Sequence, residues 1–172
     1  MKHPRGVRLQ PDASAYIDGL RMLARRELSE AQVRQRLARK EHSAGDIDAA
    51  VARLREERAI DDARVAEAIA RTETSIRKRG RLRVRMQIER AGIAKAIARK
   101  TVDEVFGGID DEAQIEAALR KRLRGRDAIA DDREFQRLYR FLVGQGFESD
   151  KALSALRRHG KRNHKDHKDH DE

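Results

Sequence analysis

The feature that most restricts the fold is an apolar register that recurs three times along the chain. It is anchored on Glu41, Gly92 and Gly146, which lie 51 and 54 residues apart. Apolar residues recur at fixed offsets from these anchors: Val33, Val84 and Leu138 eight before; Leu37, Ile88 and Leu142 four before; Ile47, Ala98 and Ala152 six after; Val51, Val102 and Leu156 ten after. Such offsets suit one face of an α-helix, so they predict three helical units of similar build.

The turns of these units are expected at the anchors. We predict that each unit has a longer leading helix followed by two shorter helices joined at a tight turn. Gly92 and Gly146 suit the left-handed residue that often ends a helix. In the first unit Glu41 takes this place, and His42 replaces the apolar residue that follows each glycine. We therefore expect the first turn to be looser or differently capped.

Helix starts carry local signals. Ser29 and Gln32 have the spacing of a capping box, and Ser43 gives a weaker cap. Acidic pairs that favour a helix N-terminus occur at Asp61-Asp62, Asp110-Asp111 and Asp131-Asp132. The apolar stripes expected outside the shared register are Tyr16, Leu20 and Leu23, in a helix from Ala13, and Val65, Ile69 and Ile76, in a helix from Asp62.

One stretch also fits a strand. Leu82, Val84, Met86 and Ile88 alternate with charged or polar residues, as in a half-buried strand. A strand needs partners and no other segment alternates, whereas a helix places Val84 and Ile88 at the buried register positions. We predict a helix, which leaves Leu82 and Met86 on another face. These two side chains either pack against a neighbouring repeat or form a docking patch with a basic rim.

The composition favours helix and a thin core. Charged residues make up 41% of the chain and aromatic residues 3%, and proline occurs only at Pro4 and Pro11. We predict an all-α tandem array of three three-helix repeats. The expected boundaries are a flexible lead at 1–12, repeats at 13–58, 59–107 and 108–160, and a disordered tail at 161–172.

The charge points to an acidic or polyanionic partner. The net charge is +10, and the stretch from Arg71 to Arg90 holds eight basic and two acidic side chains. The alternative is that each of these cations lies on a solvated helix surface and contacts no partner. The candidate contacts for a partner protein or DNA are Arg77, Lys78, Arg79, Arg81, Arg83, Arg85 and Arg90, with Arg157 and Arg158 as a second, weaker group and Leu82 and Met86 as the apolar part.

The chain lacks signals for catalysis. There is no cysteine, and no glycine-rich loop ends in Lys-Ser or Lys-Thr. Four of the six histidines fall in the last fourteen residues, so a Ser-His-acid triad has little to draw on. His164, His167 and His170 are spaced by three, but nothing fixes a metal geometry there. We predict no enzyme activity, no cofactor and no metal site, and, since no apolar run reaches membrane-span length, a cytoplasmic monomer.

Three motifs in order resemble one family. Residues 59–67 (AIDDARVAE) are followed by Arg77-Lys78-Arg79-Gly80-Arg81 and then by residues 88–93 (IERAGI), and the third unit contains residues 138–147 (LYRFLVGQGF). Together they resemble the RecX family of recombination regulators over roughly residues 13–158. Val65 stands where the family usually has an aromatic residue, and Arg81 stands where it often has proline or a small residue.

The resemblance implies an elongated, curved array of three-helix repeats that binds the RecA recombinase in the groove of its DNA filament. Members of this family typically suppress the ATPase and strand-exchange activities of RecA in recombination and DNA repair. The family supplies no catalytic site, so the candidate contacts above come from the charge distribution. The alternative function is a sequence-nonspecific, basic helical DNA-binding protein that contacts phosphates directly.

Overall fold

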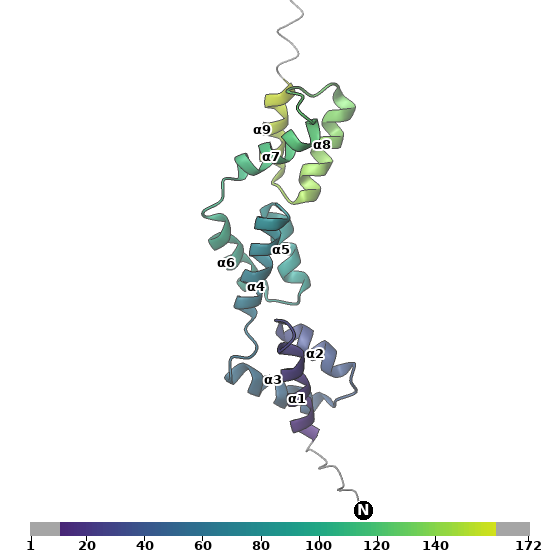
Figure 1. Cartoon of the computed structure of the whole chain (residues 1–172), viewed down its shortest axis with the longest axis vertical. Coiled ribbons are helices and arrows are strands. Elements are labelled where there is room, and N and C mark those ends of the chain that lie inside the picture. Colours follow the sequence, from purple (N-terminus) through teal and green to yellow (C-terminus); the bar gives the residue numbers. More distant parts are fainter. Residues whose placement is uncertain (1–10, 161–172) are drawn as a thin grey trace, which may run out of the picture. The chain divides into compact units, whose positions relative to one another are not determined.

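The structure, a computed structural model, describes residues 11–160, with side chains from Ser14 onward. Within this range every regular element is a helix (Figure 1). The elements are α1 (Pro11–Leu23), α2 (Glu30–Ala38), α3 (Ala44–Glu56), α4 (Asp62–Arg71), the π-helical turn η1 (Thr72–Ile76), α5 (Arg81–Arg90), α6 (Lys95–Phe106), α7 (Asp111–Leu123), α8 (Asp132–Gln145) and α9 (Ser149–Gly160). The all-α prediction is therefore confirmed.

The ends of the chain were predicted to be a flexible lead and a disordered tail. Residues 1–10 and 161–172 lie outside the described residues, and with them His164, His167 and His170. Helix α1 begins at Pro11, two residues before the expected start. Proline suits this place because the first turn of a helix leaves its N–H groups unpaired in any case.

The described helices form two compact units. One unit combines the chain up to Ala68 with Ile88–Ala98, and the other combines Ile69–Gln87 with the chain from Arg99. The first contains a core of Leu28, Val33, Leu37, Val51 and Leu54, among others, from the first repeat. The second contains a core that includes Ile115, Leu119, Leu138, Leu142 and Leu156, from the third repeat. The segments of the second repeat are shared between the units.

The apolar register is confirmed position by position. All twelve of its residues are buried. The three anchors adopt left-handed backbone conformations, with φ of 63° at Glu41, 80° at Gly92 and 93° at Gly146. The first turn closes like the third, since His42 N donates to Leu37 O at 3.4 Å and Phe147 N to Leu142 O at 3.2 Å. The C-caps differ, as Glu41 led us to expect: α2 ends at Ala38 with the right-handed Arg39 as its C-cap, whereas the left-handed Gly146 is itself the C-cap of α8.

The predicted helix starts are also confirmed. The Ser29 hydroxyl and the Gln32 side chain form both halves of a capping box at the start of α2. The Ser43 hydroxyl accepts from Asp46 N at the start of α3. Asp110 and Asp131 accept from backbone N–H groups of the first turns of α7 and α8. Each contact satisfies a donor that the helix cannot pair internally.

The strand-like alternation belongs to a helix. Residues 81–90 form α5, with Val84 and Ile88 fully buried. Leu82 is 43% exposed, and Met86 is partly buried. A period-2 pattern in a helix leaves alternate apolar residues on another face, as predicted.

Two predicted apolar stripes are wrong at particular residues. Leu20 is 36% exposed, because α1 buries Ala15 and Gly19 instead. A Cβ atom on Gly19 would lie 2.7 Å from Leu54 Cδ1, so the close approach of α3 selects this face. Ile76 is 77% exposed. It ends the π-helical turn η1, whose wider winding breaks the 3.6-residue period after Arg71.

The predicted order of helix lengths does not hold in every repeat. In the first repeat α1 and α3 each have 13 residues and α2 has 9. In the third repeat α8 is the longest, with 14 residues against 13 in α7 and 12 in α9. Because the leading helix is not the longest in the third repeat, helix length is not a shared property of the repeats.

In each of the first two repeats, the start of the second helix packs against the anchor turn of the following repeat. In the first unit the Ser29 hydroxyl donates to Ala91 O, and a Cβ atom on Gly92 would lie 2.3 Å from Ala31 Cβ. In the second unit Gly80 N donates to Gln145 O and Leu82 N donates to Gly146 O, each at 3.0 Å. We call these two contacts the repeat junctions.

Candidate functional site

The predicted basic stretch does not form one surface. Arg81 forms an ion pair with Asp103 at 2.5 Å, and its guanidinium lies over the Phe106 ring at 5.2 Å. Arg79 donates to the Gln145 side chain at 2.6 Å. Both side chains therefore hold the second unit together, and neither is a freely available cation.

The remaining residues of α5 point in several directions. Arg83 packs on Gly146, and its Nε atom is buried without a hydrogen-bond partner in the described chain. Arg85 and Arg90 are exposed, and Leu82 and Met86 lie away from the buried face. A single docking patch of Leu82 and Met86 with an arginine rim stays a prediction.

The second predicted group, on α9, is divided in the same way. Arg158 forms ion pairs with Glu116 at 3.0 Å and Glu112 at 3.6 Å, whereas Arg157 is exposed. His159 also contacts Glu116, at 2.7 Å. Burial raises the pKa of Glu116, but the hydrogen bonds from His159 and Arg158 outweigh it, so the net shift is downward. These contacts tie α9 to α7.

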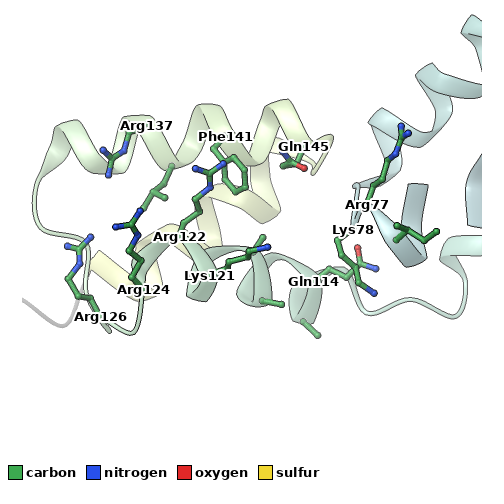
Figure 2. Close-up of a pocket in the computed structure, with 15 residues that line it drawn as sticks. Arg77, Lys78, Gln114, Lys121, Arg122, Arg124, Arg126, Arg137, Phe141 and Gln145 are labelled. Carbon is green, nitrogen blue, oxygen red and sulfur yellow. The ribbon is translucent and has the colours of Figure 1, made fainter. Parts of the chain in front are cut away.

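A groove in the second unit brings other cations together (Figure 2). It has a volume of about 1320 Å³. We call it the basic groove and define it by its lining residues, which are Ile76, Arg77, Lys78, Ala113, Gln114, Ala117, Ala118, Lys121, Arg122, Arg124, Arg126, Arg137, Leu138, Phe141 and Gln145. Seven of these residues are basic and none is acidic. Two of the seven, Arg77 and Lys78, were predicted from the sequence.

Local structure explains why the cations converge. Helix α7 has three of its basic residues in its last turn, where they complement the helix dipole. The helix ends at Arg124, whose φ is 52°, and Gly125 follows with φ of 86°. Two successive left-handed residues turn the chain toward α8. Figure 2 shows Lys121, Arg122 and Arg124 along one side of the groove and Arg137 and Phe141 on the other.

The far end of the groove is fixed by one buried carboxylate. Glu134 accepts from Arg126 through both of its oxygens, at 2.6 and 3.1 Å, and from Arg137 at 3.0 Å. It also accepts from Ala130 N at 2.9 Å. These contacts, the Arg126 hydrogen bonds foremost, lower the pKa of Glu134 to about 2. The pKa of Arg126 is raised by the same carboxylate.

The other cations of the groove are less committed. The Arg122 guanidinium lies 4.1 Å from the centre of the Phe141 ring. Arg77 pairs with Glu73 at 2.6 Å. Within residues 11–160, Lys78, Lys121 and Arg124 form no ion pair. The side-chain oxygen of Gln114, a lining residue that belongs to α7, is buried and accepts no hydrogen bond from the described residues.

A smaller basic groove lies in the first unit, between α1 and α2. Its volume is about 360 Å³, and its lining residues are Asp18, Arg21, Met22, Arg25, Arg26, Arg36 and Lys40. Asp18 is its single acid, paired with Lys40 at 3.0 Å and His42 at 3.1 Å. The Lys40 hydrogen bond is the main cause of the lowered pKa of Asp18. The helices α1 and α2 hold the same places in their repeat as α7 and α8.

Five cations of the basic groove were missed from the sequence. Four of them belong to a run, Arg120 to Arg126, that holds five basic residues and no acidic one. This run is a signal that could have been found, although cations at a helix C-terminus are also expected for stability alone. Arg137 carries no such signal, because only the fold places it opposite the run.

Two kinds of site, a metal-binding cluster and a membrane-spanning helix, are not found among the described residues 11–160. Among them, no group of three or more histidine, cysteine or acidic side chains is arranged to hold a metal ion. Among the helices of the same range, none combines the length and the apolar character that a membrane crossing requires.

Comparisons with known proteins give a consistent result. A family model for the first three-helix domain of RecX matches residues 15–54. The regulatory protein RecX of Halorhodospira halophila is 33% identical over 137 residues, which cover 79% of this chain and 82% of that protein. The regulatory protein RecX of Acidithiobacillus ferrooxidans (strain ATCC 53993 / BNL-5-31) is 36% identical over 137 residues, covering 80% and 85%.

Solved structures share the fold. The crystal structure of RecX from Lactobacillus salivarius matches with a TM-score of 0.72 at 19% identity, covering 86% of this chain and 95% of that one. A crystal structure of a regulatory protein RecX matches with a TM-score of 0.69 at 21% identity, covering 86% and 71%. At these identities the structural matches speak to the fold alone.

Proposed function

This chain belongs to the RecX family of regulatory proteins, and from that premise we propose that it binds the RecA recombinase or its DNA filament and inhibits its ATPase and strand-exchange activities. It does so as a regulator without catalytic activity of its own. The observation that carries the proposal is the match to the family's regulatory proteins over about four fifths of the chain.

The charge distribution supports a filament as the target. A nucleoprotein filament presents phosphates and acidic side chains, and a protein with clustered cations meets such a surface rapidly and with strong salt dependence. The basic groove supplies seven cations on one surface of the second unit. We propose that Arg77 and Lys78, together with the exposed Arg85, Arg90 and Arg157, also contribute to partner binding.

The internal contacts limit which substitutions can test this proposal. Reversing the charge of Arg81 would place a carboxylate beside Asp103, and reversing Arg83 would place one against the backbone of Gly146. Lost inhibition could then follow from a damaged fold. The double variant Arg90→Glu with Arg157→Glu instead reverses the charge at two exposed positions. Circular dichroism would check that the helices of this variant are intact.

The deciding experiment is RecA ATPase turnover on single-stranded DNA, with and without this protein, at two salt concentrations. We expect inhibition at stoichiometric protein that weakens at the higher salt, because exposed ion pairs are screened. Unchanged turnover at both concentrations would refute the proposal. Inhibition that survives Arg90→Glu with Arg157→Glu would leave the function standing and remove these two residues from the contact surface.

A further inference from the structure

The basic groove has a matching source of negative charge in this chain itself. Residues 169–172 (DHDE), which we call the acidic tip, follow α9 and lie outside the described residues. We propose that the acidic tip turns back from the end of α9 and binds among Lys121, Arg122 and Arg124. This contact lies within one chain, so it stands or falls independently of the proposed function.

The groove holds cations that the described residues leave uncompensated. Lys121, Arg122 and Arg124 lie along one side of it (Figure 2). Glu134, the carboxylate at its far end, already accepts from both Arg126 and Arg137. No acidic residue lines the groove, so its cations repel one another and produce a positive potential that attracts an anionic segment.

The lining favours a charged segment over an amphipathic helix as the occupant. A helix that docks in a groove needs apolar side chains of the groove to bury against. Here Leu138 is only 3% exposed, and Arg122 covers the Phe141 ring. The other apolar residues of the lining are three alanines and Ile76, at the edge of the η1 turn. Binding in this groove must therefore come mainly from charge.

The packing of α9 brings the acidic tip within reach of the groove. Ile129 N donates to His159 O at 3.4 Å, and Nδ1 of the His159 ring lies 3.1 Å from Asp127 O. The chain therefore leaves α9 beside the loop that joins α7 to α8. Asp127 and Lys121 are six positions apart and so lie at most about 22 Å from each other, whereas residues 161–169 span up to about 30 Å when extended.

The charges of the residues that follow α9 are sorted in the sense that this contact needs. Residues 161–168 contain four lysine or arginine residues and one aspartate. The acidic tip contains three acidic residues and no lysine or arginine. The groove repels the first segment and attracts the second, so the tip is the part that binds.

Other segments of the chain suit the groove less well. Residues 1–10 contain three lysine or arginine residues and no acidic one, so their charge has the same sign as that of the groove. Three acidic residues at helix starts, Asp62, Asp110 and Asp131, already accept from backbone N–H groups. The acidic tip is therefore the occupant that best complements the cations of the groove.

The short connection to α9 makes even a weak contact significant. A tether of about ten residues gives an effective concentration in the mM range, so a contact of mM affinity is formed in about half of the molecules. An anionic partner that enters the groove must then displace the acidic tip. Its apparent affinity falls in proportion to the fraction of molecules in which the groove is open.

The test measures paramagnetic relaxation in NMR spectra of the isotope-labelled, full-length protein. The chain contains no cysteine, so His170→Cys gives a nitroxide one attachment point inside the acidic tip. At about 0.1 M salt we expect the nitroxide to broaden the backbone amide signals of Lys121, Arg122 and Arg124. At about 1 M salt the Debye length falls from ~10 to ~3 Å, so the paramagnetic relaxation rate should fall at least about twofold.

One pair of variants tests the tip. Asp169→Asn with Asp171→Asn and Glu172→Gln removes its negative charge. We expect the paramagnetic relaxation rate at the groove amides to fall at least about twofold, because the contact is lost. The matched control, Lys165→Gln with Lys168→Gln, alters charges beside the tip. It should raise the rate or leave it unchanged, since it removes a repulsion.

A second pair of variants tests the groove. Lys121→Gln with Arg124→Gln should lower the rate at the groove amides by at least about twofold. The matched control, Arg90→Gln with Arg99→Gln, removes two exposed cations outside the groove and should leave the rate unchanged. Arg124→Gly removes one cation at a left-handed position that glycine accepts without strain, so it gives the answer if the double variant loses helicity.

Three outcomes would overturn the proposal. The first is equal broadening in all variants, which a segment that makes no charge contact would give. The second is broadening that is undiminished at about 1 M salt. The third comes from a mixture of isotope-labelled protein without nitroxide and unlabelled protein with nitroxide. Equal broadening of the groove amides in this mixture would mean that the tip binds a second copy of the chain.

Discussion

Gly80 and Gly146 touch through their backbones: a Cβ atom on Gly80 would lie 2.4 Å from the Gly146 carbonyl oxygen. A Cβ atom on Gly146 would lie 2.3 Å from Arg83 Cβ. The hydrogen bonds from Gly80 N and Leu82 N close this repeat junction. Glycine is required on both sides because the two segments approach more closely than any side chain allows.

We therefore expect Gly80→Ala to destabilise the protein by about 2 kcal/mol, because its methyl group would meet rigid backbone. Gly144→Ala is the matched control, since a Cβ atom there has no neighbour within 4 Å and the position lies in α8. That change should stabilise the protein by about 0.5 to 1 kcal/mol. Urea unfolding followed by circular dichroism measures both, and equal effects would contradict the contact.

Glu41 is predicted to be a strained residue. Its φ of 63° costs a residue with a Cβ atom about 1 to 2 kcal/mol. Glu41→Gly should therefore stabilise the protein, by about 1 kcal/mol once the greater freedom of glycine in the unfolded chain is included. Ala52→Gly, at an exposed position in α3, is the control and should cost about 1 kcal/mol. A thermal midpoint that falls in both variants would refute the prediction.

Ser29 and Ser43 cap consecutive helices, but only Ser29 also serves a repeat junction. Ser43→Ala should cost about 1 kcal/mol for the lost cap. Ser29→Ala should cost about 2 to 3 kcal/mol, because it also removes the hydroxyl donor from the buried contact with Ala91 O. Ser29→Thr keeps a hydroxyl and should recover part of the difference. Equal losses in the two alanine variants, by urea unfolding, would mean that the junction bond contributes nothing.

Glu134 should make stability depend on acidic pH. Folding lowers its pKa from 4.5 to about 2, so the carboxylate stabilises the protein above pH 4.5, and this stabilisation is lost as the pH falls toward 2. Glu134→Gln should be less stable at neutral pH and should lose less on acidification. Unfolding free energies measured from pH 7 to pH 2 provide the check. Parallel curves for the two proteins would show that Glu134 is not the source.

The parts of the fold that were predictable rest on short-range signals. The register anchored on Glu41, Gly92 and Gly146 repeats the same offsets three times, so each copy supports the others. The caps at Ser29 and Asp110 depend on residues only three positions apart. For α5, the repeat register outweighed the alternation, because a lone strand has no partner to satisfy its backbone.

The errors came from packing that a helical period does not encode. Gly19 faces the core because Leu54 packs closely against it. A prediction based on the spacing of large apolar residues does not count glycine, so it chose the wrong face of α1. Ile76 is exposed, contrary to the prediction, because a π-helical turn such as η1 holds more residues than an α-helical turn and so changes the face on which Ile76 lies. A count of charges along the sequence also omits ion pairs between residues that are far apart in the chain, such as Arg81 and Asp103. The basic groove escaped prediction because α8 places Arg137 opposite a run that ends eleven residues earlier.

The position twelve residues before each anchor makes a different kind of contact in the third repeat than in the first two. Ser29 and Gly80 hold this position in the first two repeats, and each receives the turn of the next repeat. In the third repeat the position is Glu134, whose carboxylate is already occupied by Arg126 and Arg137. Glu134 is therefore engaged within its own repeat, unlike Ser29 and Gly80, which contact the next one.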